Sequence, residues 1–108
     1  MKRRHGHTPK YFLEQIQEFA AAGGTRVKFT RSALEGARIL YLNAADIVAC
    51  VCGLTEHDYE QTLESTRFPG TFQDVYKPRY QGFEIYLKVR LIEDRKTLVI
   101  SFKKNTSP

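Results

Sequence analysis

The sequence has few of the residues that form disulfides or metal sites. It contains two cysteines, Cys50 and Cys52, and three histidines, at positions 5, 7 and 57. A disulfide framework in so short a chain needs more cysteines, and a structural zinc site needs four ligands at suitable spacings. We therefore expect no metal and no cofactor. We expect both cysteines to be small buried side chains in a reducing compartment.

Long apolar runs are also missing, as are the signatures of several enzyme classes. No segment approaches the roughly 20 apolar residues that cross a bilayer, and no signal-peptide core follows the basic start. The phosphate-binding loop, the dinucleotide-binding glycine motif and the HExxH zinc motif are all absent. The sequence therefore predicts a cytoplasmic protein that makes no membrane contact.

What the chain does have is basic charge. Among its 108 residues, 17 are Lys or Arg and 12 are Asp or Glu, so the formal net charge is +5. The length predicts one domain, residues 1–108, and the first seven residues, MKRRHGH, are predicted to form a basic, flexible arm. A basic balance of this size favours a polyanionic partner such as a nucleic acid.

The N-terminal half carries the signals of helices, namely cap residues followed by apolar positions at helical spacing. Residues 26–29 favour extended structure instead and are predicted to form an edge strand. The predicted helices are 9–22, capped by Thr8 and ended by Gly23; 32–40, opened by a capping box of Ser32 and Glu35; 44–52, capped by Asn43 and ended by Gly53; and a short helix after Thr55 and Asp58 that carries Tyr59 and Leu63.

The C-terminal half is predicted to be strands. Residues 71–76 follow the turn at Pro69 and Gly70, and Pro78 interrupts this strand near an edge or a bend. Helices first and strands last is the order of an α+β protein. We expect the helices to pack on the apolar face of a mainly antiparallel sheet.

The last two strands are predicted in register. From Phe83 onward, apolar and polar residues alternate along two runs that flank residues 93–96. A slip of one residue would carry apolar side chains to the solvated face, so apolar residues must oppose apolar residues. A two-residue or a four-residue loop allows this, and the lack of Gly and Asn favours the longer one. The resulting pairs are Leu91 with Leu98, Val89 with Ile100, Leu87 with Phe102, Tyr86 with Lys103, and Lys88 with Ser101.

The solvated face of these strands is rich in cations and tyrosines, a combination typical of surfaces that bind unpaired RNA. The 2′-hydroxyl of RNA can attack the neighbouring phosphorus if protein groups move two protons and stabilise the phosphorane. A tyrosine or lysine can act as the base only if its pKa falls, which nearby cations favour. Catalysis, RNA binding without catalysis, and an ordinary solvated face all remain open. The predicted RNA-binding residues are Lys77, Arg79, Lys88 and Arg90.

The chain resembles the MqsR toxins of bacterial type II toxin–antitoxin systems. The resemblance implies an endoribonuclease that cleaves mRNA without a metal, on a RelE/YoeB-like α+β fold. It also implies a cognate antitoxin, an MqsA-like protein that binds the toxin and represses the shared promoter. The matching stretches are HT at 7–8, TRSAL at 30–34, GL with E and D within 53–58, QDVYKPR at 73–79, IYLKV at 85–89 and VISFK at 99–103.

The resemblance also implies site residues. The active-site positions of the family fall on Gln73, Tyr86 and Lys103, which we expect to lie near one another. A further family lysine, expected in the short helix, falls on Gln61, which can serve neither as base nor as phosphate cation. Either that role is dispensable, or Lys77 or Arg67 takes it.

Three hypotheses follow for the function. The first is a metal-independent mRNA endoribonuclease toxin, with Tyr86 as general acid or base. The second is a catalytically weakened module on the same fold that binds RNA or the antitoxin, which the glutamine at position 61 favours. In the third, the main function of the sheet edge is to bind a strand of a partner such as an antitoxin. This hypothesis is compatible with the first.

Overall fold

The computed structural model describes residues 2–6 and 8–106, and it confirms the α+β class. The likeness to the RelE/YoeB fold stays a prediction. Short 3₁₀ turns, Gly24–Arg26 and Glu56–Asp58, precede β2 and β3. The elements are β1 (Lys2–Gly6), α1 (Leu13–Ala22), β2 (Val27–Phe29), α2 (Arg31–Ile39), α3 (Ala44–Cys52), β3 (Tyr59–Ser65), β4 (Phe72–Tyr76), β5 (Arg79–Tyr80), β6 (Phe83–Ile92) and β7 (Thr97–Lys104).

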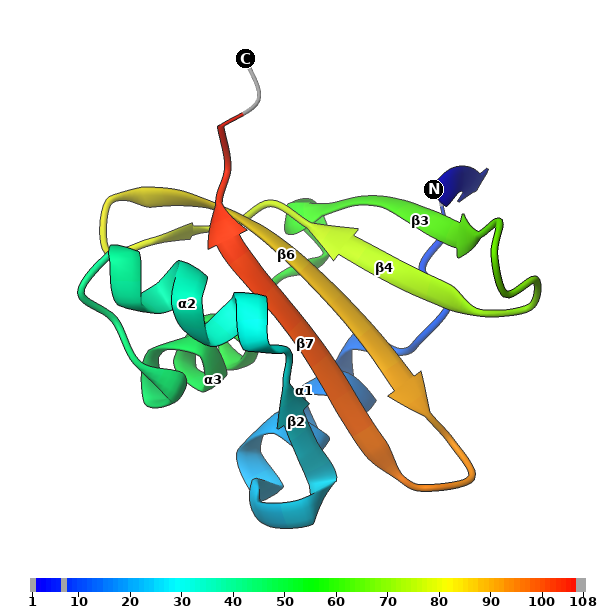
Figure 1. The fold of residues 1–108 in the computed structure, drawn as a ribbon, viewed down its shortest axis with the longest axis horizontal. Coiled ribbons are helices and arrows are strands. Elements are labelled where there is room, and N and C mark those ends of the chain that lie inside the picture. The colour runs from blue at the N-terminus through cyan, green and yellow to red at the C-terminus, as the bar shows by residue number, and fades with distance from the viewer. Residues whose placement is uncertain (1, 7, 107–108) are drawn as a thin grey trace.

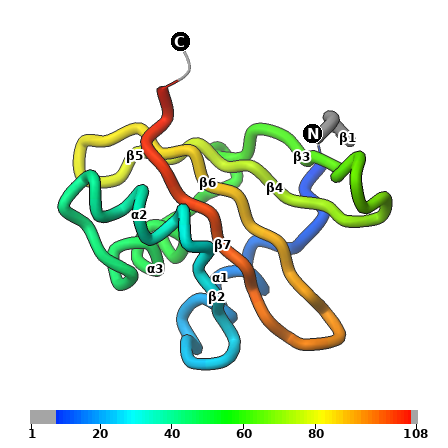
Figure 2. Tube along the Cα trace, viewed as in Figure 1, coloured from blue at the N-terminus to red at the C-terminus, as the bar shows by residue number. Residues whose placement is uncertain are grey.

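The strands form one twisted sheet in the order β1-β3-β4-β6-β7-β2 (Figure 1). All neighbours are antiparallel except β2 and β7, which are parallel. After Pro78, the short strand β5 continues the line of β4 and pairs with the start of β6. The tube view in Figure 2 shows α1 behind the sheet, with α2 lying beside β7. One face of the central strands is therefore left free of helices.

The core lies between the central hairpin and the helices. On β6 and β7, alternate residues from Ile85 to Phe102 are buried, and they pack with Ile16 of α1 and Ile47 of α3. Burial of these side chains is the main stabilising contribution, at about 25 cal/mol per Å² of apolar surface removed from water. The strict alternation is what orients the opposite, polar face toward solvent.

The predicted register of the hairpin is confirmed. Residues 93–96 form the four-residue loop, in which the Lys96 amide donates to the Glu93 carbonyl at 3.2 Å. Lys96 adopts a left-handed φ of 50°, which completes the reversal without a glycine. Every predicted pair is present, including Tyr86 opposite Lys103 and Lys88 opposite Ser101.

The start of the first helix was predicted wrongly. It begins at Leu13, not at Pro9, and ends at Gly23 as expected. The cause is a long-range contact with Asp74, which the local sequence does not reveal. The backbone amides of Lys10 and Tyr11 donate to the Asp74 carboxylate, each at 2.9 Å. This contact ties the bent segment before α1 to strand β4, and the helix begins only after it.

The second helix is capped two residues earlier than predicted. The Thr30 hydroxyl, not that of Ser32, accepts the Ala33 amide at 3.0 Å, while Glu35 binds Arg38 instead of closing a capping box. The third helix is as predicted, with a complete capping box of Asn43 and Asp46 and an end at Gly53.

The cysteines divide into one buried and one exposed thiol. Cys50 is buried, and this burial raises its pKa to about 12. Cys52 is exposed, contrary to the prediction, and its thiol lies against the Gln17 carbonyl at the end of α3. Among the described residues, no three His, Cys, Asp or Glu side chains gather as a possible metal site.

The prediction of a short helix after Thr55 is wrong. Thr55 and Asp58 do form a capping box, but it serves only a 3₁₀ turn, and residues 59–65 form strand β3. Apolar residues at 59 and 63 fit a period of two as well as a helical period, and pairing with β4 and β1 decides for the strand. Residues 2–6 of the predicted basic arm form strand β1, and residues 1 and 7 of it lie outside the described residues.

Helices in the described part of the chain are too short, or too polar, for any of them to cross a membrane.

Gly36 allows α2 to approach the edge of β7. A Cβ at this position would lie 2.3 Å from the Phe102 carbonyl oxygen and 3.2 Å from the Lys103 Cα. We expect Gly36→Ala to lower the free energy of unfolding by about 1–3 kcal/mol, because this overlap outweighs the roughly 1 kcal/mol by which alanine favours a helix. Urea denaturation measures the change.

The matched control for this prediction is Gly53→Ala. Its Cβ would meet the Ala49 carbonyl at 3.4 Å, an ordinary contact, and its backbone is right-handed. Equal stabilities of the two variants would contradict the close approach at Gly36.

Candidate functional site

The predicted site residues share the face of the sheet that the helices leave free. The pairing of β4 with β6, continued by β5 after Pro78, keeps one register throughout, and successive side chains alternate between the two faces. We call this surface the polar strip. It consists of Gln73, Lys77 and Arg79 on the β4–β5 line, Tyr86, Lys88 and Arg90 on β6, and Ser101 and Lys103 on β7.

The centre of the polar strip is Tyr86, which lies between two lysines. The Lys103 Nζ is 5.3 Å from the centre of the tyrosine ring, and the Lys77 Nζ is 5.9 Å from it. Both distances suit a cation–π contact. Tyr86 is half-buried, whereas Lys103 is exposed. The convergence of a phenol and an ammonium, predicted from the hairpin register, is confirmed and extended by a second ammonium.

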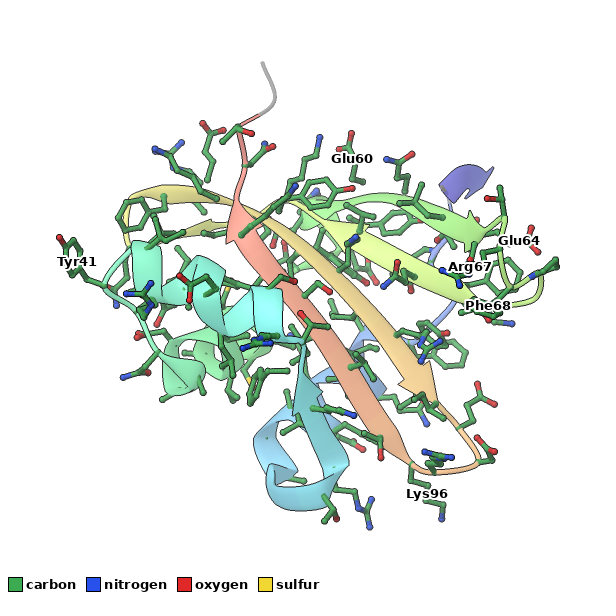
Figure 3. The ribbon with its side chains drawn as sticks, in the orientation of Figure 1. Tyr41, Glu60, Glu64, Arg67, Phe68 and Lys96 are labelled. Carbon is green, nitrogen blue, oxygen red and sulfur yellow. The ribbon has the colours of Figure 1, made fainter. Side chains whose placement is uncertain are left out.

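Glu60 joins this centre from β3. The pairing of β3 with β4 shifts between Tyr59 and Gln61, so Glu60 is the extra residue of a bulge, a device that re-aims side chains. Its carboxylate lies 3.6 Å from the Lys77 ammonium. Glu60 stands at the rim of the sheet near β3 and β4 in Figure 3. The sequence prediction missed it, because a bulge leaves no signal in an alternating pattern.

The electrostatics of Tyr86 differ from the expectation. Burial raises the pKa of its phenol above the ordinary value, and the negative charge of Glu60 raises it further. The idea that neighbouring cations lower this pKa is therefore wrong, because desolvation of the phenolate outweighs them. Tyr86 is protonated at neutral pH. It is suited to donate a proton, not to accept one.

A cavity of about 400 Å³ opens beside Tyr86 and Lys103, between the polar strip and α2. Its volume falls within the range of small-molecule sites. The far wall carries Glu35, whose carboxylate is held by Arg38, and this ion pair lowers the pKa of Glu35. The lining residues are Ser32, Glu35, Gly36, Ile39, Tyr86, Lys88, Ser101, Phe102 and Lys103.

Gln73 lies apart from Tyr86 and Lys103, contrary to the expectation. The position that faces Tyr86 across the strands is that of Lys77, and Gln73 is four residues further along the β4 line. At about 3.3 Å per residue this separates the two sites by roughly 13 Å. Gln73 instead neighbours Leu63 of β3 and lines a different cavity with Arg90.

Gln61 lies on strand β3, not on a helix. It pairs with Val75, which in turn pairs with Lys88, so position 61 lies on the same face of the sheet as the polar strip, in the row of Lys88. A glutamine there brings no charge. Of the two candidates to replace a cation, Lys77 lies next to Tyr86, whereas Arg67 lies in the loop between β3 and β4, against Phe68.

Comparison with known proteins bears on the whole of this surface. A family profile described as "Motility quorum-sensing regulator, toxin of MqsA" matches residues 8–104. The chain is also 35% identical over 103 residues to the mRNA interferase toxin MqsR of Escherichia coli (strain K12), which covers 95% of this chain and 98% of that protein. The family profile covers every residue of the polar strip, and the relative covers nearly the whole chain. The chain therefore belongs to the MqsR toxin family.

Proposed function

We propose that the protein cleaves single-stranded mRNA without a metal ion, by attack of the 2′-hydroxyl on the adjacent phosphorus, with Tyr86 and Lys103 at the reaction centre. As a member of the MqsR family, the chain is the toxin of a toxin–antitoxin system and has endoribonuclease activity. The choice of mRNA as substrate follows the name of the Escherichia coli relative, an mRNA interferase. Cleavage of mRNA would inhibit translation and growth, and it assigns the protein to the cytoplasm.

The observation that carries the proposal is a protonated tyrosine between two lysines on a basic face of the sheet. Lys77 and Lys103 flank the ring of Tyr86, and the remaining cations extend in both directions along the polar strip. Lysine and arginine side chains bind the phosphates of a single strand, and this binding weakens with salt. We assign Arg79 and Lys88 to the RNA backbone, and Arg90 to an RNA contact further along the polar strip.

The reaction can be written with all atoms accounted for. The 2′-oxygen bonds to phosphorus and loses its proton, and the bond from phosphorus to the 5′-oxygen breaks. Tyr86 donates its proton to the leaving 5′-oxygen, while Lys103 stabilises the negative phosphorane. We propose that the carboxylate of Glu60 accepts the proton of the 2′-hydroxyl. Glu60 is close enough to Tyr86 for its negative charge to raise the pKa of the phenol. The products are a 2′,3′-cyclic phosphate and a 5′-hydroxyl.

Lys77 takes the role of the family lysine, whose position is occupied by Gln61 in this chain. It lies between Glu60 and Tyr86, 3.6 Å from the carboxylate and 5.9 Å from the ring centre. A cation here holds the carboxylate in place and attracts the phosphate. This assignment accounts for an active enzyme in spite of the glutamine at position 61.

The toxin–antitoxin system also supplies a protein partner, an antitoxin. We propose that this antitoxin is MqsA-like and represses the promoter that the two proteins share. Co-purification of the toxin with the protein encoded beside it tests this partnership.

The deciding assay incubates the purified protein with a defined single-stranded RNA in excess EDTA. We expect cleavage products that end in a cyclic phosphate and a 5′-hydroxyl. The same RNA with a 2′-deoxynucleotide at the cleavage site should resist. RNA that binds the protein but stays intact would favour the weakened module, and cleavage that requires added Mg²⁺ would contradict the mechanism.

A further inference from the structure

A second cavity, of about 220 Å³, lies at the far end of the polar strip from Tyr86. The loop between β3 and β4 forms one wall, and the polar faces of β4, β6 and β7 form the floor. It is smaller than the sites that hold drug-sized ligands, so it suits one flat ring system. It is lined by Ser65, Phe68, Thr71, Gln73, Arg90 and Val99.

The floor of this cavity contains an unused hydrogen-bond acceptor. The Oε1 atom of Gln73 is buried and has no hydrogen-bond partner, and it is the single side-chain atom of this kind in the described part of the chain. Buried polar atoms almost always have partners, so an exception calls for an explanation. Because the Gln73 side chain lines the cavity, a rotation of its amide would let this oxygen accept a hydrogen bond from a ligand.

The wall of the cavity presents an aromatic ring. Phe68 is 62% exposed although it is fully apolar, and the Arg67 guanidinium lies 5.4 Å from its ring centre. Both residues are labelled in the β3–β4 loop in Figure 3. Exposed aromatic rings and guanidinium planes are the groups on which proteins stack unpaired bases.

Hydrogen bonds fix the loop that carries this ring. The Phe68 amide donates to the Ser65 hydroxyl at 3.1 Å, and the Phe68 carbonyl accepts the Thr71 amide at 3.1 Å. The Gly70 amide donates to the Glu64 carboxylate at 3.0 Å. The backbone that carries the ring is therefore held by hydrogen bonds within the loop.

The polar groups of the cavity define what it accepts. Gln73 offers an acceptor, and the Arg90 guanidinium offers donors only. A ring N–H beside a carbonyl oxygen complements this pair. Guanine and uracil carry such a lactam edge, whereas adenine and cytosine have no ring N–H on their base-pairing edge. The amines of adenine and cytosine are also donors but lie beside a ring nitrogen, whereas arginine in base recognition most often contacts guanine, through its carbonyl oxygen and N7.

We propose that this cavity is a nucleobase pocket, in which Phe68 stacks on the base while Gln73 and Arg90 read the lactam edge of guanine or uracil. The proposal rests on the proposed RNA substrate. Since Gln73 lies roughly 13 Å along the strands from the position of Tyr86, the base belongs to a nucleotide near the scissile phosphate, not to the phosphate itself. Gln73 is then a specificity residue, and the pocket selects where the RNA is cut.

Binding can be tested without cleavage, because the chain contains no tryptophan. Phe68→Trp places a single fluorescent reporter in the pocket, which a stacked base quenches. We expect GMP and UMP to quench it at concentrations about tenfold lower than AMP and CMP, the factor that one hydrogen bond of typical net strength gives. The control reporter is Tyr41→Trp, at a side chain that is 97% exposed beyond α2, and no nucleotide should quench it selectively.

A second substitution separates recognition from simple stacking. In the Phe68→Trp protein, Gln73→Met keeps the length of the side chain but removes its acceptor, and we expect all four nucleotides to quench alike. The urea unfolding midpoint of each variant confirms that it is folded. Equal quenching by the four nucleotides before this change, or unchanged selectivity after it, would overturn the proposal whatever the outcome of the RNA cleavage assay.

Cleavage of an RNA with randomised positions around one site gives an independent measurement. We expect Gln73→Met and Arg90→Met to erase the preference for guanine or uracil at one position near the cut. Arg95→Met removes the same charge in the exposed hairpin loop and should leave the preference intact. A preference that survives both pocket substitutions would refute the pocket even in an active enzyme.

Discussion

Replacing Asp74 with alanine is expected to lower the free energy of unfolding by about 3 kcal/mol or more. This carboxylate is fully buried on β4, at 0% exposure. It accepts the amides of Lys10 and Tyr11, each at 2.9 Å, and the hydroxyl of Thr62 at 2.6 Å. Hydrogen bonds to a charged group contribute about 1.5–3 kcal/mol each. Alanine would leave the two backbone amides without this partner, while the Thr62 hydroxyl keeps the Thr8 carbonyl at 3.2 Å.

The measurement is urea denaturation, with hydrogen exchange of the Lys10 and Tyr11 amides as a local probe. Both amides should lose protection in the variant, because the segment before α1 is tied to the sheet through this carboxylate. Glu84→Ala removes an exposed carboxylate from β6 and should shift the unfolding free energy by no more than about 0.5 kcal/mol. An Asp74→Ala protein as stable as the Glu84 variant would show that the network does not stabilise the fold.

The same contact shows where prediction from sequence ends. Asp74 is 64 and 63 residues from its two backbone donors, so nothing in the local sequence reveals that it interrupts a helix predicted from Pro9. Thr8 and Pro9 are residues that favour the start of a helix, but the tertiary contact with Asp74 outweighs this local preference. The end of that helix at Gly23 depended only on local backbone preference, and it was predicted correctly.

The hairpin was predictable for the opposite reason. Burial alternates along β6 from Ile85 and along β7 as far as Lys103, so a single register buries the apolar set. The alternation alone therefore suffices to pair Tyr86 with Lys103. On β3 the bulge between Tyr59 and Gln61 interrupts the alternation. For this reason the sequence pattern predicted neither the strand nor the position of Glu60.

The position of Gln73 could not be predicted, because the sequence does not reveal how β4 pairs with β6. Its distance from Tyr86 depends on which residues of β4 face β6, and Pro78 conceals that β5 continues the same line. Membership of one family and of one strip suggested that Gln73, Tyr86 and Lys103 act together. The structure divides them between a centre suited to proton transfer and a cavity suited to recognition.

Replacing Tyr86 with phenylalanine is expected to reduce the rate of RNA cleavage by about 10²–10⁴-fold, the usual contribution of a general acid. The substitution removes one hydroxyl and keeps the ring between its two lysines, so folding and RNA affinity should change little. Single-turnover cleavage of a defined RNA, with binding measured separately, resolves the two effects. Tyr41→Phe removes a hydroxyl from a fully solvated ring and is the matched control.

The pH profile tests the direction of proton transfer. An acid must be protonated to act, and burial raises the pKa of Tyr86 above the ordinary tyrosine value of about 10, so this requirement is met throughout the neutral range. The rate should fall only at pH values above that pKa, and the fall should vanish in Tyr86→Phe. A rate that instead rises with pH through the tyrosine range, and a variant that loses this rise, would make Tyr86 the base. Unchanged cleavage by Tyr86→Phe would remove it from the chemistry and leave proton transfer to Glu60 and the two lysines.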